Sequence, residues 1–349
     1  MGSRYRSLAV LILTTLLLSA CAPGMAATPA VEQPAAALPP ATEQALDEAP
    51  SANLTDSCAA NYNESVDYFP EKADISYAGG FTVEYHENYK IVEVAAAWPG
   101  SPAFRYVLVQ CGTPTPEGFD GLPVIEVPVA SIVAMSTSYI PVLESIGTLD
   151  SLAGVDDFAY VNNPAVRARI EAGDLVAISP GGQINVEQAL ALDPALIMAF
   201  SSGAPEYDVH PALIEAGLPV VMNADWLEAV PLGRAEWVKF IALFYNREAA
   251  AEEAFAGIEA RYEEARDLAA SVSDRPVVFT SIPWQGTWYM PGGASFQAVL
   301  LRDAGADYLY ADDTSTGSLF LDFETVFNDA RDADVWIDLN GFATLADLA

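Results

Sequence analysis

Apolar side chains recur at helical spacing between residues 231 and 271. The spacing i, i+3, i+4, i+7, i+8 is that of an α-helix with one apolar face, and Pro231 suits its first turn because no amide hydrogen is needed there. At about 1.5 Å per residue, Leu232 to Asn246 predicts a helix about 22 Å long. After Asn246 and Arg247 a second apolar stripe begins. The two stripes comprise Trp237, Phe240, Ile241, Phe244 and Tyr245, then Phe255, Ile258, Tyr262 and Leu268.

Short apolar runs alternate with short helical patterns on both sides of this stretch. Ser136, Thr137 and Ser138 are expected to cap the first such helix, and Gly147 to end it. Strands alternating with helices predict a parallel sheet with crossovers. We expect strands at 175–178, 195–200, 218–223, 276–282 and 333–340, and helices at 139–147, 185–192, 210–216, 295–305 and from 323 onward.

The region before residue 124 has a different pattern. Residues 81–94 predict a hairpin turning at Glu87 and Asn88, and residues 104–111 form a further β-rich run. The Val- and Ile-rich stretch 121–135 is typical of a strand buried in a sheet. Residues 284–293, WQGTWYMPGG, are expected to form an aromatic loop.

The long helix could be a crossover within one large sheet or a link between two lobes. Residues 185–198 and 322–337 repeat one pattern: a capping Asn185 or Asp322, then Glu187 or Glu324, an apolar pair, an Asp and a strand. Equivalent helix–strand units on both sides of the helix favour two similar lobes. We therefore expect an α/β fold of two Rossmann-like lobes joined by a single long helix.

The composition narrows the class of protein. Of 349 residues, 52% are apolar, which suffices for one large or two small cores. The formal net charge of −33 excludes a broad nucleic-acid-binding face. Arg4 and Arg6 precede a short apolar run that has the build of a secretory signal. Its end, LLSAC, resembles the bacterial lipobox and predicts a lipid anchor on Cys21.

The first 123 residues divide by composition. We expect a lipoprotein signal at 1–21, a disordered Ala- and Pro-rich tether at 22–55, and a β-rich extension at 56–123. The tether would place the protein outside the cytoplasm, attached to the membrane at the cell surface or in the periplasm. In an oxidising compartment Cys58 and Cys111 could pair, and two free buried thiols are the alternative.

Motifs of several enzyme classes are missing. The sequence contains no GxSxG, Walker, HExxH or CxxC motif. Its two histidines, His86 and His210, do not stand in a cluster with ligand spacing, so a dedicated zinc site is not expected. We expect no enzyme and no cofactor. A secreted acidic hydrolase, and a surface sensor or adhesion lipoprotein on the same fold, remain as alternatives.

From about Val124 onward the chain resembles class III solute-binding proteins of bacterial ABC importers, which carry iron-siderophores, haem and cobalamin. The pieces that carry the resemblance are SIGTLDSLAGV, NVEQALALDPALIM, AGLPVV, PLGRAEWVKFIALFYNREAAAEEAF and the block from PGG to FETVFNDARDADVWI. The resemblance implies an N-terminal lobe at 124–231, an interlobe helix at 232–247 and a C-terminal lobe at 248–349. Family members usually continue further, so we expect this second lobe to be incomplete.

The resemblance also implies a function and its residues. A monomer would capture a metal chelate, most readily a ferric siderophore, and dock on an importer permease through Glu187 and Glu324, with Glu144 and Glu236 as further exposed candidates. The cargo would lie at the carboxyl ends of strands, and Tyr207 or His210 could supply an axial ligand. The expected contacts are Ser136, Thr137, Ser138, Tyr139, Gly181, Gly182, Gln183, Ser201, Ser202, Trp284, Gln285, Trp288, Tyr289 and Ser295.

Overall fold

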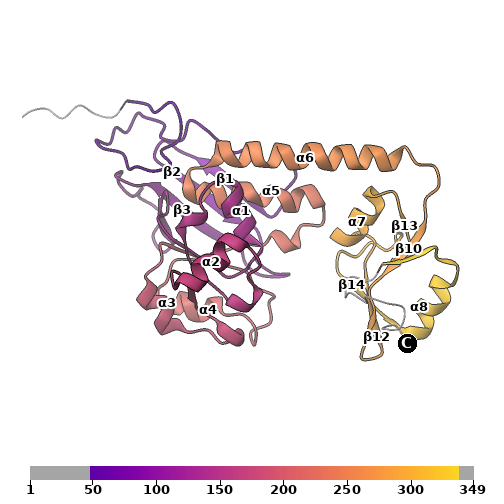
Figure 1. Ribbon diagram of the computed structural model, residues 1–349. Helices are drawn as coiled ribbons and strands as arrows, with labels where there is room; N and C mark the ends of the chain where they lie inside the picture. Colours follow the sequence, from indigo (N-terminus) through magenta and orange to yellow (C-terminus); the bar gives the residue numbers. More distant parts are fainter. Residues whose placement is uncertain (1–47, 338–349) are drawn as a thin grey trace, which may run out of the picture. The chain divides into compact units, whose positions relative to one another are not determined.

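The computed structural model describes residues 48–337. Cys21 and most of the tether predicted at 22–55 lie outside the described residues. The first described elements form a four-stranded sheet in the order β1-β2-β3-β4 (Figure 1). The predicted hairpin is confirmed, because Phe81 pairs with Val94 and Tyr85 with Lys90. The strands are β1 (Phe81–Tyr85), β2 (Tyr89–Val94), β3 (Phe104–Gln110) and β4 (Val124–Val127), of which only the β3–β4 pair is parallel.

Cys58 and Cys111 are joined by a disulfide. The bond fastens the irregular chain that precedes the sheet to the end of β3. The Ala59 amide also donates to the Cys111 carbonyl oxygen at 2.9 Å. The structure thus decides between the two states that the sequence leaves open for these cysteines.

A five-stranded parallel sheet follows, in the order β7-β6-β5-β8-β9. The predicted alternation of strands and helices is confirmed here. The strands are β5 (Ile132–Ala134), β6 (Leu152–Val155), β7 (Val176–Ala177), β8 (Leu196–Ala199) and β9 (Val220–Met222). The helices are α1 (Tyr139–Ser145), α2 (Pro164–Ala172), α3 (Val186–Leu192) and α4 (His210–Glu215), with 3₁₀ turns η1 (Leu149–Ser151), η2 (Phe158–Tyr160), η3 (Pro180–Gly182) and η4 (Asp225–Leu227).

Helix caps follow the sequence signals at some positions only. Asn185 caps α3, since its Oδ1 accepts from the Gln188 amide at 2.9 Å. The cap expected at the start of α1 is wrong: Ser138 makes no side-chain cap hydrogen bond. Its hydroxyl oxygen lies 2.8 Å from that of Ser136 instead, so the two hydroxyl groups satisfy each other.

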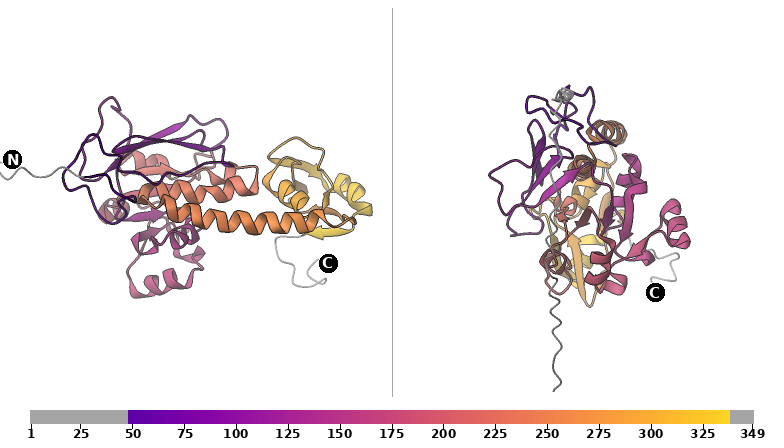
Figure 2. Two further views of the ribbon diagram at one scale, coloured as in Figure 1. Left: turned by 90° about the horizontal axis from the view of Figure 1, so that it is seen from above. Right: turned by 90° about the vertical axis from the view of Figure 1, so that its left-hand side faces the viewer.

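The helix predicted at 232–246 is α5 (Pro231–Ala242), extended by the 3₁₀ turn η5 (Leu243–Tyr245). Asn246 then adopts a left-handed conformation that ends it, as such a residue commonly does. The second apolar stripe lies on the 23-residue α6 (Glu248–Ala270), which packs against α5 (Figure 2). Both acidic and basic side chains of α5 are buried, among them Glu236 and Lys239.

The remaining elements form two small sheets. One is parallel, in the order β13-β10-β15, and the other is antiparallel, in the order β11-β12-β14. Asp322 caps the last helix by accepting from the Thr325 amide. The elements are β10 (Val277–Thr280), β11 (Pro283–Trp284), β12 (Thr287–Pro291), α7 (Phe296–Asp303), β13 (Asp307–Tyr308), β14 (Ser318–Asp322), α8 (Phe323–Asp329), η6 (Ala330–Asp332) and β15 (Val335–Ile337).

The aromatic segment WQGTWYMPGG is not the loop that its sequence predicts. It folds as the hairpin of β11 and β12, in which Trp284 pairs with Thr287. The two turn residues Gln285 and Gly286 both have positive φ. This is the backbone of a tight two-residue hairpin, whose twist matches that of the flanking strands. The sequence prediction overlooked a Gly at the second turn position.

Buried residues from the β1–β4 sheet, the parallel sheet, α5 and the start of α6 form one continuous hydrophobic cluster. Phe81 of β1 packs edge-on against Trp237 and Phe240 of α5, with ring centroids 4.9 and 5.2 Å away. The region predicted as an extension therefore shares its core with the sheet that follows it. A separate small cluster joins β12, α7, β13 and α8 around Trp288 and Met290.

Candidate binding site

The loops that follow β5, β8 and β9 enclose a pocket of about 320 Å³. It lies at the carboxyl edge of the parallel sheet, where open α/β sheets form their ligand crevices. One helix residue of α5 completes the wall. The lining residues are Ser136, Ser138, Tyr139, Phe200, Ser201, Ser202, Asp225, Trp226 and Arg234. The structure thus brings together five of the residues expected from the sequence.

A second hollow of about 330 Å³ continues along the same edge, past the ends of β6 and β7. It shares Phe200 and Ser202 with the first. Gly182 and Tyr207, both singled out from the sequence, lie in its wall. The full lining is Met135, Asp156, Ser179, Gly182, Phe200, Ser202, Tyr207, Asp208 and Val209. The two hollows form one continuous surface, which we call the edge site.

Exposed aromatic rings lie along the edge site. Phe200 is 46% exposed, Trp226 37% and Tyr207 77%. Tyr139 differs, since it is buried and only its margin reaches the pocket. Large rings that stay exposed at a concave surface are typical of sites that cover the flat or apolar parts of a ligand.

Asp208 is the most strongly held acid of the edge site. Its carboxylate accepts from the Ser201 and Ser202 hydroxyl groups and from the Ser202 and Gly203 amides, at 2.6 to 3.2 Å. Burial opposes ionisation of this group, but the hydrogen bonds from Ser201 and Ser202 outweigh it and lower the pKa of Asp208. Asp208 is therefore a fixed negative charge that orders the loop after β8.

Two further acids, Asp156 and Asp225, have raised pKa values. Burial raises the pKa of Asp156, although a hydrogen bond from Ser179 opposes the rise. Burial also raises the pKa of Asp225, with the Arg234 guanidinium opposing. The Arg234 Nε lies 3.8 Å from the Asp225 carboxylate, and its guanidinium carbon lies 5.2 Å from the centroid of the Phe296 ring. The lining therefore holds three carboxylates and one guanidinium.

Several expected contacts lie elsewhere. Thr137 lines neither hollow, and Gln183 lies beside Glu187 in a shallow surface depression. Gly181 donates its amide to Asp157. His210 is buried, its ring 5.3 Å from that of Trp98, and it lines neither hollow. Of the two residues expected as axial ligands, only Tyr207 lies in the wall of a hollow.

The aromatic hairpin divides its residues between surface and core. Trp284 is 66% and Tyr289 40% exposed, whereas Trp288 is 5% exposed. The Trp288 indole N–H donates to the Thr280 carbonyl oxygen at 3.0 Å. Ser295 caps α7 by accepting from the Ala298 amide. Trp288 and Ser295 thus have structural roles, and Gln285 is a turn residue.

Of the four candidate docking acids, three are exposed and one is buried. Glu187 and Glu324 are both exposed, each in the first turn of its helix. Glu144 is exposed and accepts from the Asn163 side-chain amide at 2.9 Å. The expectation that Glu236 is exposed is wrong, because this residue is fully buried and ion-paired with Lys239 at 3.1 Å. Most of its neighbours on α5 are also buried. An acidic residue on a helix is normally expected at the surface, so the sequence gives no sign that Glu236 is buried.

The sequence reasoning missed nine lining residues: Met135, Asp156, Ser179, Phe200, Asp208, Val209, Asp225, Trp226 and Arg234. The serines were expected because ligands bind at the carboxyl ends of parallel strands. Asp156, Phe200 and the loop after β9 also follow the carboxyl ends of strands, so the same rule could have identified them. Arg234 carries no such signal, because it lies on a helix that only the tertiary fold brings to this edge.

A larger hollow, about 570 Å³, lies beside the Cys58–Cys111 disulfide. Its walls include residues that precede β5 and β6, so it lies at the amino edge of the sheet, and no exposed aromatic ring faces it. Residues 48–337 contain no group of three or more His, Cys, Asp or Glu residues that could hold a metal ion. Over the same range, no helix is long and apolar enough to cross a membrane.

Comparison with known proteins identifies the family. A sequence model described as periplasmic binding protein matches residues 132–341, more than half of the chain. Two uncharacterized lipoproteins of Methanocaldococcus jannaschii are each 27% identical, over 62% and 73% of this chain. These matches cover 54% and 67% of the relatives, so the chain spans only about half the length of the first.

A solved structure has the same fold. It is a possible iron-binding (periplasmic solute-binding) protein from Staphylococcus epidermidis ATCC 12228, with 18% identity and a TM-score of 0.50 over 61% of this chain and 78% of that chain. At this identity the likeness concerns the fold alone. The family match and the parallel sheet with its edge site agree with the resemblance carried by the sequence motifs. The chain belongs to the periplasmic binding protein family.

Proposed function

We propose that this protein is an extracytoplasmic solute-binding lipoprotein that captures a metal chelate and delivers it to an ABC importer. The observation that carries the proposal is the edge site, where exposed rings and hydroxyl groups meet at the carboxyl ends of five parallel strands. Members of the family are substrate-binding proteins and not enzymes, which supports a role without turnover.

A ferric siderophore is our first choice of cargo, with haem and cobalamin next. The exposed rings of Phe200 and Trp226 would cover the organic shell of the chelate, and the serine hydroxyl groups would bond its polar rim. The one guanidinium among three carboxylates supports a chelate that carries little negative charge. The description of the Staphylococcus protein as possibly iron-binding is consistent with this choice.

The two-lobe arrangement is part of the proposal. A first lobe at 124–231 and a second at 248–349 would be joined by the helical segment 232–247, continued by α6. Trp284 and Tyr289 are the exposed residues through which the second lobe would contact cargo. Closure of the lobes would then bury the chelate between these rings and the edge site.

Delivery is proposed to use one acidic contact per lobe. Glu187 and Glu324 are exposed in equivalent first helical turns, so both carboxylates are free to approach arginine side chains of a permease. Such pairs are bidentate and geometrically selective. The same positions also complement the helix dipoles, so stability and docking must be measured separately. Cys21 would tether the protein to the membrane throughout.

Titration of the purified protein distinguishes the possible cargoes. Ferrioxamine B, haemin and cyanocobalamin are added in turn while tryptophan emission is recorded, and isothermal calorimetry confirms each response. Saturable quenching by one class is expected, and Trp226→Phe should remove most of it because Trp226 lines the edge site. Absence of binding by a folded protein to every chelate, including haem and cobalamin, would refute the proposed function.

A further inference from the structure

The N-terminal region reaches the wall of the edge site through one buried carboxylate, that of Glu228. This residue directly follows η4, the turn that supplies Asp225 and Trp226 to the pocket. The Glu228 Oε1 accepts from the amides of Gly79 and Gly80, at 3.0 and 2.8 Å. It also accepts from the indole N–H of Trp237 at 2.9 Å. Three donors from two separate segments therefore converge on one oxygen atom.

Two glycines pack closely against the Glu228 side chain. A Cβ added to Gly80 would lie 2.8 Å from the Trp237 ring and 3.0 Å from the Glu228 Oε1. A Cβ added to Gly233 would lie 3.0 Å from the Tyr77 carbonyl oxygen and 3.2 Å from the Glu228 Oε2. Both approaches are shorter than ordinary van der Waals contacts, so glycine is required on both sides of the carboxylate.

A second carboxylate fixes the same N-terminal segment farther along α5. Glu236 accepts from the amides of Ser76, Tyr77 and Ala78, at 3.0, 2.7 and 2.7 Å. Burial opposes its ionisation, but these hydrogen bonds outweigh it and lower the pKa of Glu236. Residues 76–80 are thus held by two acids, of which only Glu228 adjoins the pocket wall.

We infer that Glu228 is a positioning residue through which the N-terminal region holds η4, and with it Asp225 and Trp226, in the geometry that binds cargo. The inference rests on the proposed function for its ligand. The region before β5 is then part of the binding unit, although the family match begins only at residue 132. A wall whose Glu228 is held by three donors is preorganised, so the cargo need not order it on binding.

Glu228→Gln tests the inference, because it keeps the size of the side chain, removes its charge and places an NH2 group either against the three donors or, if the amide oxygen takes the Oε1 position, against the Gly79 amide, which lies 3.3 Å from Oε2. The expected result is a loss of about 5- to 10-fold in affinity for whichever chelate the wild type binds. Hydrogen exchange of the cargo-free protein should show faster exchange of the amides at 224–228. Trp237→Phe, which removes one donor and keeps an aromatic ring, should give a smaller change in the same direction.

Glu236→Gln is the matched control. It breaks the same kind of contact to the same segment, so it should lower the melting temperature and speed exchange at 76–78 while leaving affinity within about twofold. If Glu228→Gln binds cargo like the wild type and its 224–228 amides stay protected, the positioning role is refuted. If the wild type binds no chelate, the proposed function fails, while unchanged exchange at 224–228 would still refute the positioning role separately.

Discussion

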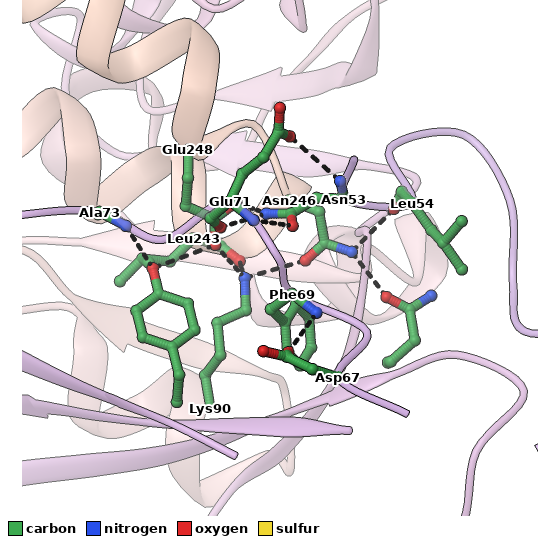
Figure 3. A network of polar contacts seen from close by, with 12 residues as sticks. Asn53, Leu54, Asp67, Phe69, Glu71, Ala73, Lys90, Leu243, Asn246 and Glu248 are labelled. Atoms are coloured by element: carbon green, nitrogen blue, oxygen red, sulfur yellow. Dashed lines mark hydrogen bonds and ion pairs between the residues drawn. The ribbon is translucent and has the colours of Figure 1, made fainter. Parts of the chain in front are cut away.

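Lys90 on β2 and Glu248 at the start of α6 form an ion pair of 2.5 Å in which neither side chain has any exposed surface (Figure 3). The Lys90 ammonium also donates to the Leu243 carbonyl oxygen and to the Asn246 side-chain oxygen, at 2.8 and 2.9 Å. Its three hydrogens thus have three acceptors. Burial lowers the pKa of Lys90, and the Glu248 carboxylate opposes this shift.

Removal of one member of this pair should destabilise the protein strongly. Lys90→Met leaves a buried carboxylate without its cation, which typically costs about 3–5 kcal/mol. Adding Glu248→Gln removes the stranded charge and should recover part of the loss. Urea unfolding gives the free energies. Arg105→Met, which breaks a half-exposed pair with Glu93, should change stability by about 1 kcal/mol or less. Equal effects of Lys90→Met and Arg105→Met would contradict the burial argument.

The buried His210 should make stability depend on pH. Burial lowers the pKa of His210, and the Asp208 carboxylate opposes this shift. The unfolded chain, with a histidine pKa of about 6.5, then binds more protons than the folded one. Stability from this group is fully present above that value and is lost as pH falls below it. Melting temperatures from pH 8 to 5 should show a decline that His210→Gln reduces, and an equal decline in both proteins would contradict the assignment.

Phe200 is expected to contribute most to cargo affinity, since it borders both hollows of the edge site. Phe200→Ala removes a large exposed ring and should weaken binding by about 10- to 100-fold with little change in stability. Calorimetric titration measures this. Tyr160→Ala is the control, because Tyr160 is 62% exposed and lines neither hollow. A similar loss in both variants would remove Phe200 from the site.

The carboxylates of the edge site should select against anionic chelates. Asp156→Asn combined with Asp225→Asn removes two negative charges, so affinity for a ferric tris-catecholate should rise by about tenfold relative to ferrioxamine B. The increase should shrink in high salt, because the interaction between the chelate and these partly buried charges is then screened in part. Asp150→Asn, at the opposite edge of the sheet, serves as the control. An unchanged preference would show that charge does not determine the choice of cargo.

Docking should require both exposed glutamates. Glu187→Ala with Glu324→Ala is expected to abolish uptake in cells and to leave cargo affinity unchanged, since neither residue lines the edge site. Glu215→Ala with Glu264→Ala changes the net charge equally at two other exposed positions and should preserve uptake. Uptake that survives the first double change would refute the docking assignment.

Much of the fold was predictable because it depends on local signals. Asn185 and Asp322 are N-cap residues, whose side chains accept hydrogen bonds from amides of the first helical turn. Ser136 and Ser201 could be predicted because both follow parallel strands, whose carboxyl ends lie along one edge of the sheet where ligands bind. These signals need no knowledge of what packs against them.

The remaining features depend on contacts between distant segments. Glu236 has the sequence context of an exposed helical acid, and only the amides of residues 76–78 reveal it as buried. Arg234 reaches the edge site because α5 crosses the sheet there. Trp288 shares a hairpin with the exposed Trp284, yet strand alternation turns it toward the core. No local pattern encodes these environments.

The core shared between the β1–β4 sheet and α5 also constrains how the chain folds. Lys90 and Glu248 are 158 residues apart, so this buried ion pair and the packing of the first sheet on α5 cannot form until α5 and the start of α6 have been synthesised. Closing so long a loop delays the contacts that stabilise it. We therefore expect the N-terminal sheet to reach its full stability late in folding.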